Sequence, residues 1–204
     1  MRKFIVILFL LVFLSPIEST FGQTPSKFWI RSLEGKRFDS RKEKLPYVLS
    51  FFFVNCIPCI KEIPELYKFM NTNFPNVPLL FIDPIKEDSK KDIQRFSEKL
   101  KVPSSYFYKD SFGTISKKFF KDKMSFPTIV GIRGNEYLFR FNGIDETILD
   151  EIKCFIFKSL AALLRIKLSA SVPPEVNIIS EELTFKCAAI SFLDTSINDL
   201  EGLP

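Results

Sequence analysis

Two cysteines separated by two residues, Cys56 and Cys59, are the side chains of this chain best suited to chemistry. A cysteine thiolate is a nucleophile that can attack a disulfide and form a mixed disulfide with it. A second thiol three positions further along is within reach to break that mixed disulfide. The spacing therefore predicts thiol–disulfide exchange in which Cys56 attacks and Cys59 resolves the intermediate.

Two other interpretations of the cysteine pair compete with exchange. Half of a zinc site needs a second pair of ligands, but the chain has no histidine, and Cys154 and Cys187 lie 33 residues apart. We therefore expect no metal site. A purely structural disulfide is the other interpretation, although a bridge that closes so short a loop constrains the unfolded chain little. That alternative stays open.

The residues around the pair indicate a strand that passes into a helix. The apolar run at residues 47–54 has the length and the Phe and Val content of a strand buried on both faces. After Cys59 the apolar residues recur every three or four positions, which is the period of one helix face. Cys56 then lies at the first turn, where unpaired N–H groups and the helix macrodipole favour a thiolate. We expect that thiolate to be exposed.

Further along the chain, apolar patterns alternate between the periods of strands and helices. The expected elements are a hairpin at 27–38, a strand at 79–82, a charged helix at 85–101, an extended segment at 102–108, a short helix within 110–120, a strand at 137–141 and a last helix from Asp145 to about 165. This order predicts an α/β fold with βαβ units around a mostly parallel sheet.

Five motifs make the chain resemble the thioredoxin superfamily, and within it the TlpA/ResA-like extracytoplasmic proteins. They are Leu33-Glu34-Gly35-Lys36, Cys56-Ile57-Pro58-Cys59, Lys61-Glu62-Ile63-Pro64-Glu65-Leu66, Phe126-Pro127-Thr128 and Asn142-Gly143. The resemblance covers residues from about 28 to 165 and implies a thioredoxin-like fold, a central mixed β-sheet flanked by helices. It also implies a cis bond between Phe126 and Pro127 beside the disulfide, with the backbone of Phe126 binding the substrate chain.

Glu62 is the third candidate catalytic residue. Ser50 lies six residues before Cys56, where thioredoxin has a buried aspartate that shuttles protons. Glu62 falls where ResA-like proteins carry an active-site glutamate, and on a helix it shares a face with Cys59. A half-buried carboxylate beside two thiols would have a raised pKa and could take the proton of Cys59. A solvated helix glutamate is the alternative.

The residues beside Cys56 bear on the direction of electron flow and on substrate binding. Pro58 adds neither a donor nor a charge next to Cys56, whereas oxidants of the DsbA kind usually have a histidine there, so a reductant is favoured. Asn55 stands where many thioredoxins have a tryptophan. That part of the substrate platform is either missing or supplied by residues 51–53.

The N-terminus is typical of a secreted protein. Arg2 and Lys3 precede an uncharged run at residues 4–14, and Thr20-Phe21-Gly22 offers a small-x-small cleavage site. We therefore predict a signal peptide at residues 1–22, whose apolar run is too short to span a bilayer as a helix. The protein is expected to be extracytoplasmic and periplasmic, or tethered to the membrane should the segment stay uncleaved.

The remaining chain divides into residues 23–166, the expected thioredoxin-like domain, and residues 167–204, an acidic extension of unknown role. The last helix and the extension each carry one further cysteine, Cys154 and Cys187. In an oxidising compartment these two could form a structural disulfide. Two unrelated thiols are the alternative.

The charge pattern limits the classes of partner. The chain has a net charge of +5, but its lysines are spread along several predicted helices without a basic arm, so we expect no nucleic acid. No cofactor is expected. A secreted dithiol that acts as a reductant needs a protein disulfide as substrate and a membrane or periplasmic electron donor, which the sequence does not identify.

Three functions remain after these arguments. The leading one is a secreted thioredoxin-like oxidoreductase that reduces protein disulfides. A non-catalytic binding module with the same fold is the main alternative. A peroxiredoxin-type peroxidase is less well supported, because such enzymes have Thr or Ser three residues before the attacking cysteine and this chain has Phe53.

Overall fold

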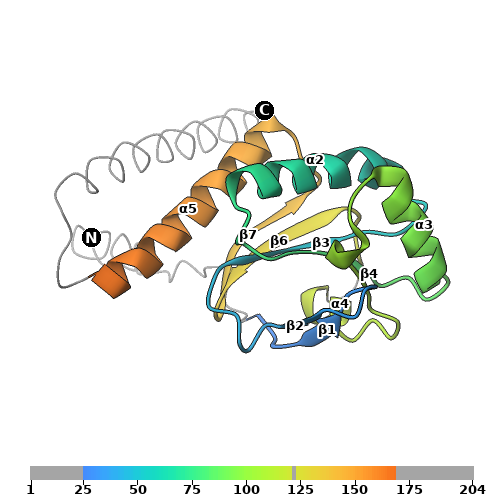
Figure 1. Ribbon diagram of the computed structural model, residues 1–204, viewed down its shortest axis with the longest axis horizontal. Helices are drawn as coiled ribbons and strands as arrows, with labels where there is room; N and C mark the ends of the chain where they lie inside the picture. The colour runs from blue at the N-terminus through green and yellow to red at the C-terminus, as the bar shows by residue number, and fades with distance from the viewer. Residues whose placement is uncertain (1–24, 121–122, 169–204) are drawn as a thin grey trace, which may run out of the picture.

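A five-stranded sheet forms the centre of the molecule, in the order β5-β4-β3-β6-β7 (Figure 1). The structure, a computed structural model, describes residues 25–120 and 123–168, with side chains up to residue 163. The strands are β3 (Tyr47–Phe51), β4 (Leu79–Asp83), β5 (Phe107–Lys109), β6 (Thr128–Arg133) and β7 (Glu136–Asn142). Strands β3, β4 and β5 are parallel, whereas β6 is antiparallel to β3 and β7. The mixed sheet that the resemblance implied is confirmed. The mostly parallel sheet expected from the order of elements is wrong, because two of the four strand pairings are antiparallel.

Helices cover one face of this sheet, and a hairpin with a short helix covers the other (Figure 1). The first group is α2 (Ile57–Asn73), α3 (Lys90–Leu100) and α5 (Glu146–Leu168). The second group is the antiparallel pair β1 (Trp29–Arg31) and β2 (Arg37–Asp39), together with α4 (Ser116–Phe119). The central sheet is therefore buried on both sides, as its apolar strands predict.

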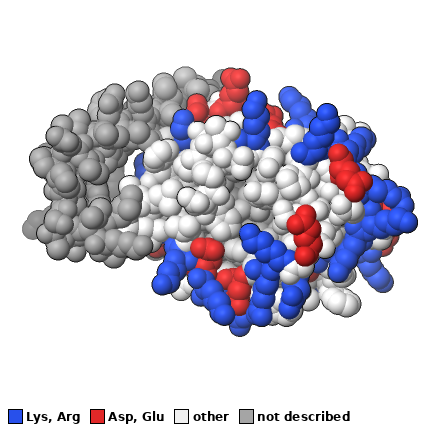
Figure 2. Space-filling view, viewed as in Figure 1, with Lys and Arg blue, Asp and Glu red and all other residues white. Residues whose placement is uncertain are grey.

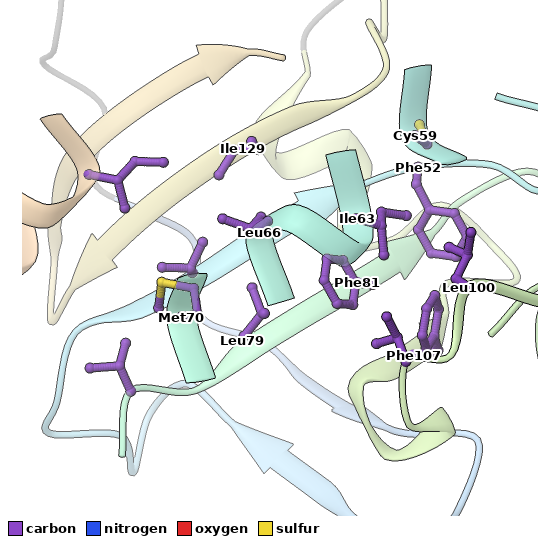
Figure 3. Close-up of a cluster of buried hydrophobic side chains, with 14 of the residues drawn as sticks. Phe52, Cys59, Ile63, Leu66, Met70, Leu79, Phe81, Leu100, Phe107 and Ile129 are labelled. Atoms are coloured by element: carbon purple, nitrogen blue, oxygen red, sulfur yellow. The ribbon is translucent and has the colours of Figure 1, made fainter. Parts of the chain in front are cut away.

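Alternation along the strands divides the core into two layers. On β3, Val48 packs in the cluster beneath the helices, whereas Leu49 and Phe51 pack in the cluster beneath the hairpin. Figure 3 shows Ile63 and Leu66 of α2 in the helix-side layer, together with side chains of β4, β5 and β6. Each such fully buried side chain stabilises the fold by about 1.5–3 kcal/mol. The cysteine pair at the start of α2 belongs to this helix-side layer of the core.

Several boundaries differ from those expected. Strand β3 ends at Phe51 rather than at 54, because the chain turns there and Cys56 N–H donates to Phe53 O. Helix α3 begins at Lys90 rather than at 85, because Ser89 caps it in a capping box with Asp92. The extended segment expected at 102–108 contains a short 3₁₀ helix, η1 (Ser104–Tyr106), before β5.

The last helix begins as predicted. Ile148 N–H donates to Asp145 Oδ1 at 2.8 Å, which is the bond expected of a capping aspartate. Helix α5 continues to Leu168 and so runs past the boundary expected at 166. The signal segment at 1–22 and all of the extension beyond residue 168 lie outside the described residues. Within the described part of the chain, no helix is both long and apolar enough to span a membrane.

Charged side chains surround the body without forming one continuous stripe on the face in view (Figure 2). Lys and Arg lie mostly toward the edges of that face and are interspersed with Asp and Glu, while uncharged groups fill its middle. This distribution is that of an ordinary solvated surface.

Candidate functional site

Cys56 and Cys59 form a disulfide where the chain passes from β3 into α2. Cys56 is the N-cap residue of α2, and its Sγ accepts a hydrogen bond from Cys59 N–H at 3.3 Å. Pro58 lies in the first turn, where a missing N–H costs little. The predicted junction is confirmed, and a thiolate at Cys56 would face an N–H donor of the first helical turn.

The prediction that Cys56 is exposed is wrong for the protein with the Cys56–Cys59 disulfide formed. Cys56 is 2% exposed and Cys59 is fully buried. Both belong to the cluster beneath the helices, against which Phe53 and Phe126 pack. The small accessible surface of the pair therefore belongs to Cys56, the residue expected to attack. Next to it, Ile57 is 81% exposed and forms an apolar contact surface beside the sulfur.

An aromatic pair lies beside the cysteines. The rings of Phe53 and Phe126 meet edge to face, with centroids 5.3 Å apart, and both side chains are half-buried. Phe51 and Phe52 point into the core and are fully buried. Of the three phenylalanines considered as substitutes for the missing tryptophan, only Phe53 is placed to contribute to a binding surface.

The peptide bond between Phe126 and Pro127 is cis, as the resemblance implied. This loop is attached to the end of β7, because Gly143 N–H donates to Pro127 O at 3.1 Å. Ser125 Oγ donates to Asn142 Oδ1 at 2.9 Å, and Thr128 Oγ1 donates to Ser125 O at 2.7 Å. The cis-proline loop is therefore held by several hydrogen bonds, while Phe126 stays half-buried at its rim.

Glu62 is held by a backbone hydrogen bond. Its Oε2 accepts the N–H of Ile144 at 2.9 Å, and the side chain is half-buried. Burial raises the pKa of the Glu62 carboxyl, and the Ile144 hydrogen bond partly opposes that rise. The residue that precedes Ile144, Gly143, binds the cis-proline loop, so the same short segment contacts both Glu62 and Pro127. Proton transfer between Glu62 and Cys59 stays a prediction.

Sequence reasoning missed a buried ion pair next to this site. Asp83, at the carboxyl end of β4, is fully buried, and Lys109 Nζ of β5 lies 3.1 Å from its Oδ1. Burial raises the pKa of Asp83 to about 7, although Lys109 acts in the opposite direction. The available signal was an aspartate at the end of an apolar strand next to β3, where parallel sheets place functional groups.

The other two cysteines are Cys154 and Cys187. Cys154 is half-buried on α5, and Cys187 lies outside the described residues. Their pairing stays a prediction. Ser50 is buried in β3 as an internal strand residue.

Comparisons with known proteins bear on the fold of the chain. No protein-family model matches the chain. No curated protein matches its sequence. Solved structures do match, among them a putative protein disulfide isomerase from Bacteroides thetaiotaomicron with a TM-score of 0.61 and 20% identity, over 69% of this chain and 90% of that one. The fold is thioredoxin-like.

Two further structures with this thioredoxin-like fold cover similar parts of the chain. StoA from Bacillus subtilis has a TM-score of 0.55 and 20% identity, over 64% of this chain and 96% of its own. A putative thiol:disulfide interchange protein DsbE from Chlorobium tepidum has a TM-score of 0.56 and 19% identity, over 69% and 97%. At such identities the likeness is one of fold alone.

Proposed function

We propose that this protein is an extracytoplasmic thiol–disulfide oxidoreductase that reduces protein disulfides through Cys56 and Cys59. The observation that carries the proposal is the position of Cys56 Sγ, at the N-cap of α2 and 3.3 Å from Cys59 N. A thiolate there is stabilised by that N–H group and by the positive end of the helix. The adjacent cis-proline loop and exposed Ile57 offer a surface for a substrate chain.

The exchange would proceed in two displacements. The Cys56 thiolate attacks one sulfur of the substrate disulfide, a mixed disulfide forms, and the other substrate sulfur leaves as a thiolate and is protonated. Cys59 then loses its proton and attacks Cys56 Sγ, which releases the second substrate thiol. Two electrons have passed to the substrate, and the Cys56–Cys59 disulfide remains. A membrane or periplasmic dithiol donor must return the two electrons.

Glu62 is the proposed acceptor of the Cys59 proton. Its half-buried carboxyl has a pKa raised by burial, which brings its proton affinity closer to that of a thiol. Ile144 N–H holds the carboxyl in one orientation. Ser50, where thioredoxin has its aspartate, cannot accept a proton at neutral pH, so Glu62 takes that role.

Phe126 and Pro127 are the proposed substrate-binding residues. A substrate segment that lies in an extended conformation beside the loop could form backbone hydrogen bonds with Phe126, as a strand does at a sheet edge. The Phe53 and Phe126 rings and Ile57 would contact its apolar side chains. The sequence of residues 1–22 supports secretion, and Pro58 beside Cys56 supports reduction as the direction.

Insulin reduction with dithiothreitol tests the activity. The wild-type protein should accelerate precipitation of the insulin B chain, and Cys56→Ser should abolish the acceleration because the nucleophile is lost. Cys59→Ala should accumulate mixed disulfides with extracytoplasmic proteins, because nothing resolves them. The proposal would be contradicted by two results together: no insulin reduction by the wild-type protein, and no mixed disulfide accumulated by Cys59→Ala.

One observation favours a non-catalytic binding module as the second candidate. The disulfide is almost completely buried, with Cys56 only 2% exposed. A binding module would be inert in the insulin assay, and its disulfide would also resist dithiothreitol. A measured reduction potential therefore separates the two functions, since a value near about −270 mV is typical of a reductant of the thioredoxin kind.

A further inference from the structure

A group of buried and half-buried charges lies at the ends of β4 and β5 and in the loop that follows β4, and it is hydrogen-bonded to the turn before Cys56. Besides the ion pair with Asp83, Lys109 Nζ donates a hydrogen bond to Ile85 O. Ile85 N–H donates to Asp83 Oδ1 at 2.8 Å. The side chain of Lys109 is 5% exposed, and that of Asp83 is fully buried. Together these bonds hold the first residues of the loop at 84–88 against the ends of β4 and β5.

Stability alone is a weak reason for such a pair. Removal of two charges from water is costly, and apolar residues of similar volume often replace a buried ion pair without loss of stability. One oxygen of the pair, Asp83 Oδ2, also accepts no hydrogen bond. An unpaired buried oxygen carries a further cost and calls for an explanation beyond packing.

The loop that the ion pair holds also contacts the turn before Cys56, through Asp88 at its other end. Asp88 Oδ2 accepts the backbone N–H of Val54 at 3.0 Å, a contact between residues 34 positions apart. Val54 is two residues before Cys56, in the turn that joins β3 to α2. The same turn is held on its other side by Phe52 N–H, which donates to Ile82 O at 3.1 Å. The loop at 84–88 therefore fixes the backbone that leads into the nucleophile.

Asp83 and Asp88 also interact with each other. The Asp88 carboxylate helps to raise the pKa of Asp83, in addition to burial, while Lys109 and the Ile85 N–H lower it. Lys109 from β5 is the charged group in contact with Asp83, and Asp88 from the loop influences its pKa.

We propose that Asp88 is a positioning residue for thiol–disulfide exchange: carried by a loop that the Asp83–Lys109 pair holds at Ile85, it fixes the backbone of Val54 and thereby the orientation of Cys56 Sγ toward Cys59 N–H. This inference rests on the proposed function. Loss of the Val54 contact would let the turn move, which would weaken the hydrogen bond to Cys56 Sγ and destabilise the thiolate. Asp88 acts through the backbone and does not touch the substrate.

The test measures the reactivity of Cys56 directly, without any protein substrate. In a Cys59→Ser background, iodoacetamide alkylation at pH 7 is followed by mass spectrometry of the Cys56 peptide. Asp88→Ala should lower the rate constant about tenfold. The reason is the weakened hydrogen bond from Cys59 N–H to the Cys56 thiolate, since a hydrogen bond to a charged group is worth roughly that factor. Asp88→Asn keeps an acceptor oxygen and should restore the rate to within about threefold of the parent. Asp83→Asn should give an intermediate rate.

Asp110→Ala is the matched control. Asp110 is also a buried aspartate just beyond the end of a neighbouring strand, and its Oδ2 accepts the N–H groups of Ile115 and Ser116. These contacts hold the start of α4 rather than the turn that joins β3 to α2. This variant should lower the melting temperature while it leaves the alkylation rate within about twofold of the parent.

Two results would overturn the inference. One is an Asp88→Ala rate within about twofold of the parent, and the other is an equal loss of rate in Asp110→Ala, which would indicate general destabilisation. Failure of the proposed function gives a different pattern. In that case insulin reduction would be absent in the wild-type protein, whereas the alkylation rate of Cys56 would still depend on Asp88.

Discussion

Cys56 and Cys59 are made unequal by the backbone around them. The sulfur of Cys56 caps α2 and receives a hydrogen bond from the backbone of Cys59, whereas Cys59 is completely buried within the first turn. A negative charge is therefore favoured on Cys56 and disfavoured on Cys59. This difference suits a nucleophile that meets the substrate and a resolving thiol that needs a separate proton acceptor.

That need leads to a prediction for Glu62. Glu62→Gln keeps the side-chain volume and a donor–acceptor group but cannot accept the Cys59 proton. The release of substrate from the mixed disulfide should slow by about a hundredfold, the lower end of the range of general-base effects. Because the pKa of Glu62 is raised, the rate of release in the wild-type protein should fall as acidification protonates this carboxyl. The rate of the variant should not show this fall.

Rapid-quench measurements of mixed-disulfide decay across a pH range would show this effect. Glu65→Gln on the same helix is the matched control and should change the rate by no more than about twofold. Equal decay rates in the wild-type protein and Glu62→Gln at every pH would remove Glu62 from the mechanism.

A second prediction concerns Asp83 and the dependence of the free energy of unfolding on pH. The folded protein holds a proton on Asp83 up to a pKa of about 7, whereas the unfolded chain releases it near the ordinary aspartate pKa of 3.8. The native state therefore binds more protons between these values, so stability falls as pH rises from about 4 to about 7. The loss attributable to Asp83 is up to about 4 kcal/mol, since a tenfold difference in proton affinity corresponds to about 1.4 kcal/mol.

Urea unfolding of the wild-type protein and Asp83→Asn at several pH values would measure this dependence. The asparagine variant does not titrate, so its free energy of unfolding should rise relative to wild type as pH increases through this window. A constant difference between the two proteins from pH 4 to pH 8 would show that Asp83 titrates normally.

Among the elements, the short segment after β7 links the separate parts of the site. Gly143 N–H binds Pro127 O of the cis-proline loop, and Ile144 N–H binds Glu62 of α2. Gly143 has a φ of +91°, which L-residues rarely adopt. A Cβ at Gly143 would lie 3.5 Å from Glu62 Oε1, so the glycine is needed for its backbone conformation more than for space.

Gly143→Ala should therefore reduce both stability and exchange. The strained φ should cost about 1–3 kcal/mol in the free energy of unfolding, and the displaced Ile144 N–H should loosen Glu62. Gly35→Ala is a matched control, because Gly35 has a φ of +86° in the β1–β2 hairpin with open space around it. That variant should lose similar stability in urea but retain insulin reduction. Equal activity losses in the two variants would indicate that the segment has no specific role.

In the molecule as a whole, helix α5 bears a cysteine whose predicted partner is in the acidic extension. We predict a disulfide between Cys154 and Cys187, and peptide mapping under non-reducing conditions should recover the two linked. Cys187→Ser should lower the free energy of unfolding by about 2–4 kcal/mol, since the bridge closes a loop of intermediate length. Cys56→Ser is the comparison that leaves this bridge intact. Separate alkylated peptides containing Cys154 and Cys187 would contradict the pairing.

Local patterns were sufficient for most of the fold. A continuous apolar run predicted β3 and helical spacing predicted α2, with Cys56 at their junction, because both patterns depend on neighbours a few residues apart. Boundaries were less well predicted where a cap decides them, as with Ser89 at the start of α3. The cis bond before Pro127 came from the resemblance, since a proline alone favours trans.

The amino-acid sequence by itself determined the reacting sulfurs, their place at a helix terminus and the α/β order of elements, because each depends on short-range spacing. Only the tertiary structure decided how far Cys56 is buried and that Asp88 contacts Val54, 34 residues away. It also decided that Asp83 lies beside Lys109 of β5. These contacts arise from the parallel register of β3, β4 and β5, and the sequence separation of the partners leaves no local pattern from which to read them.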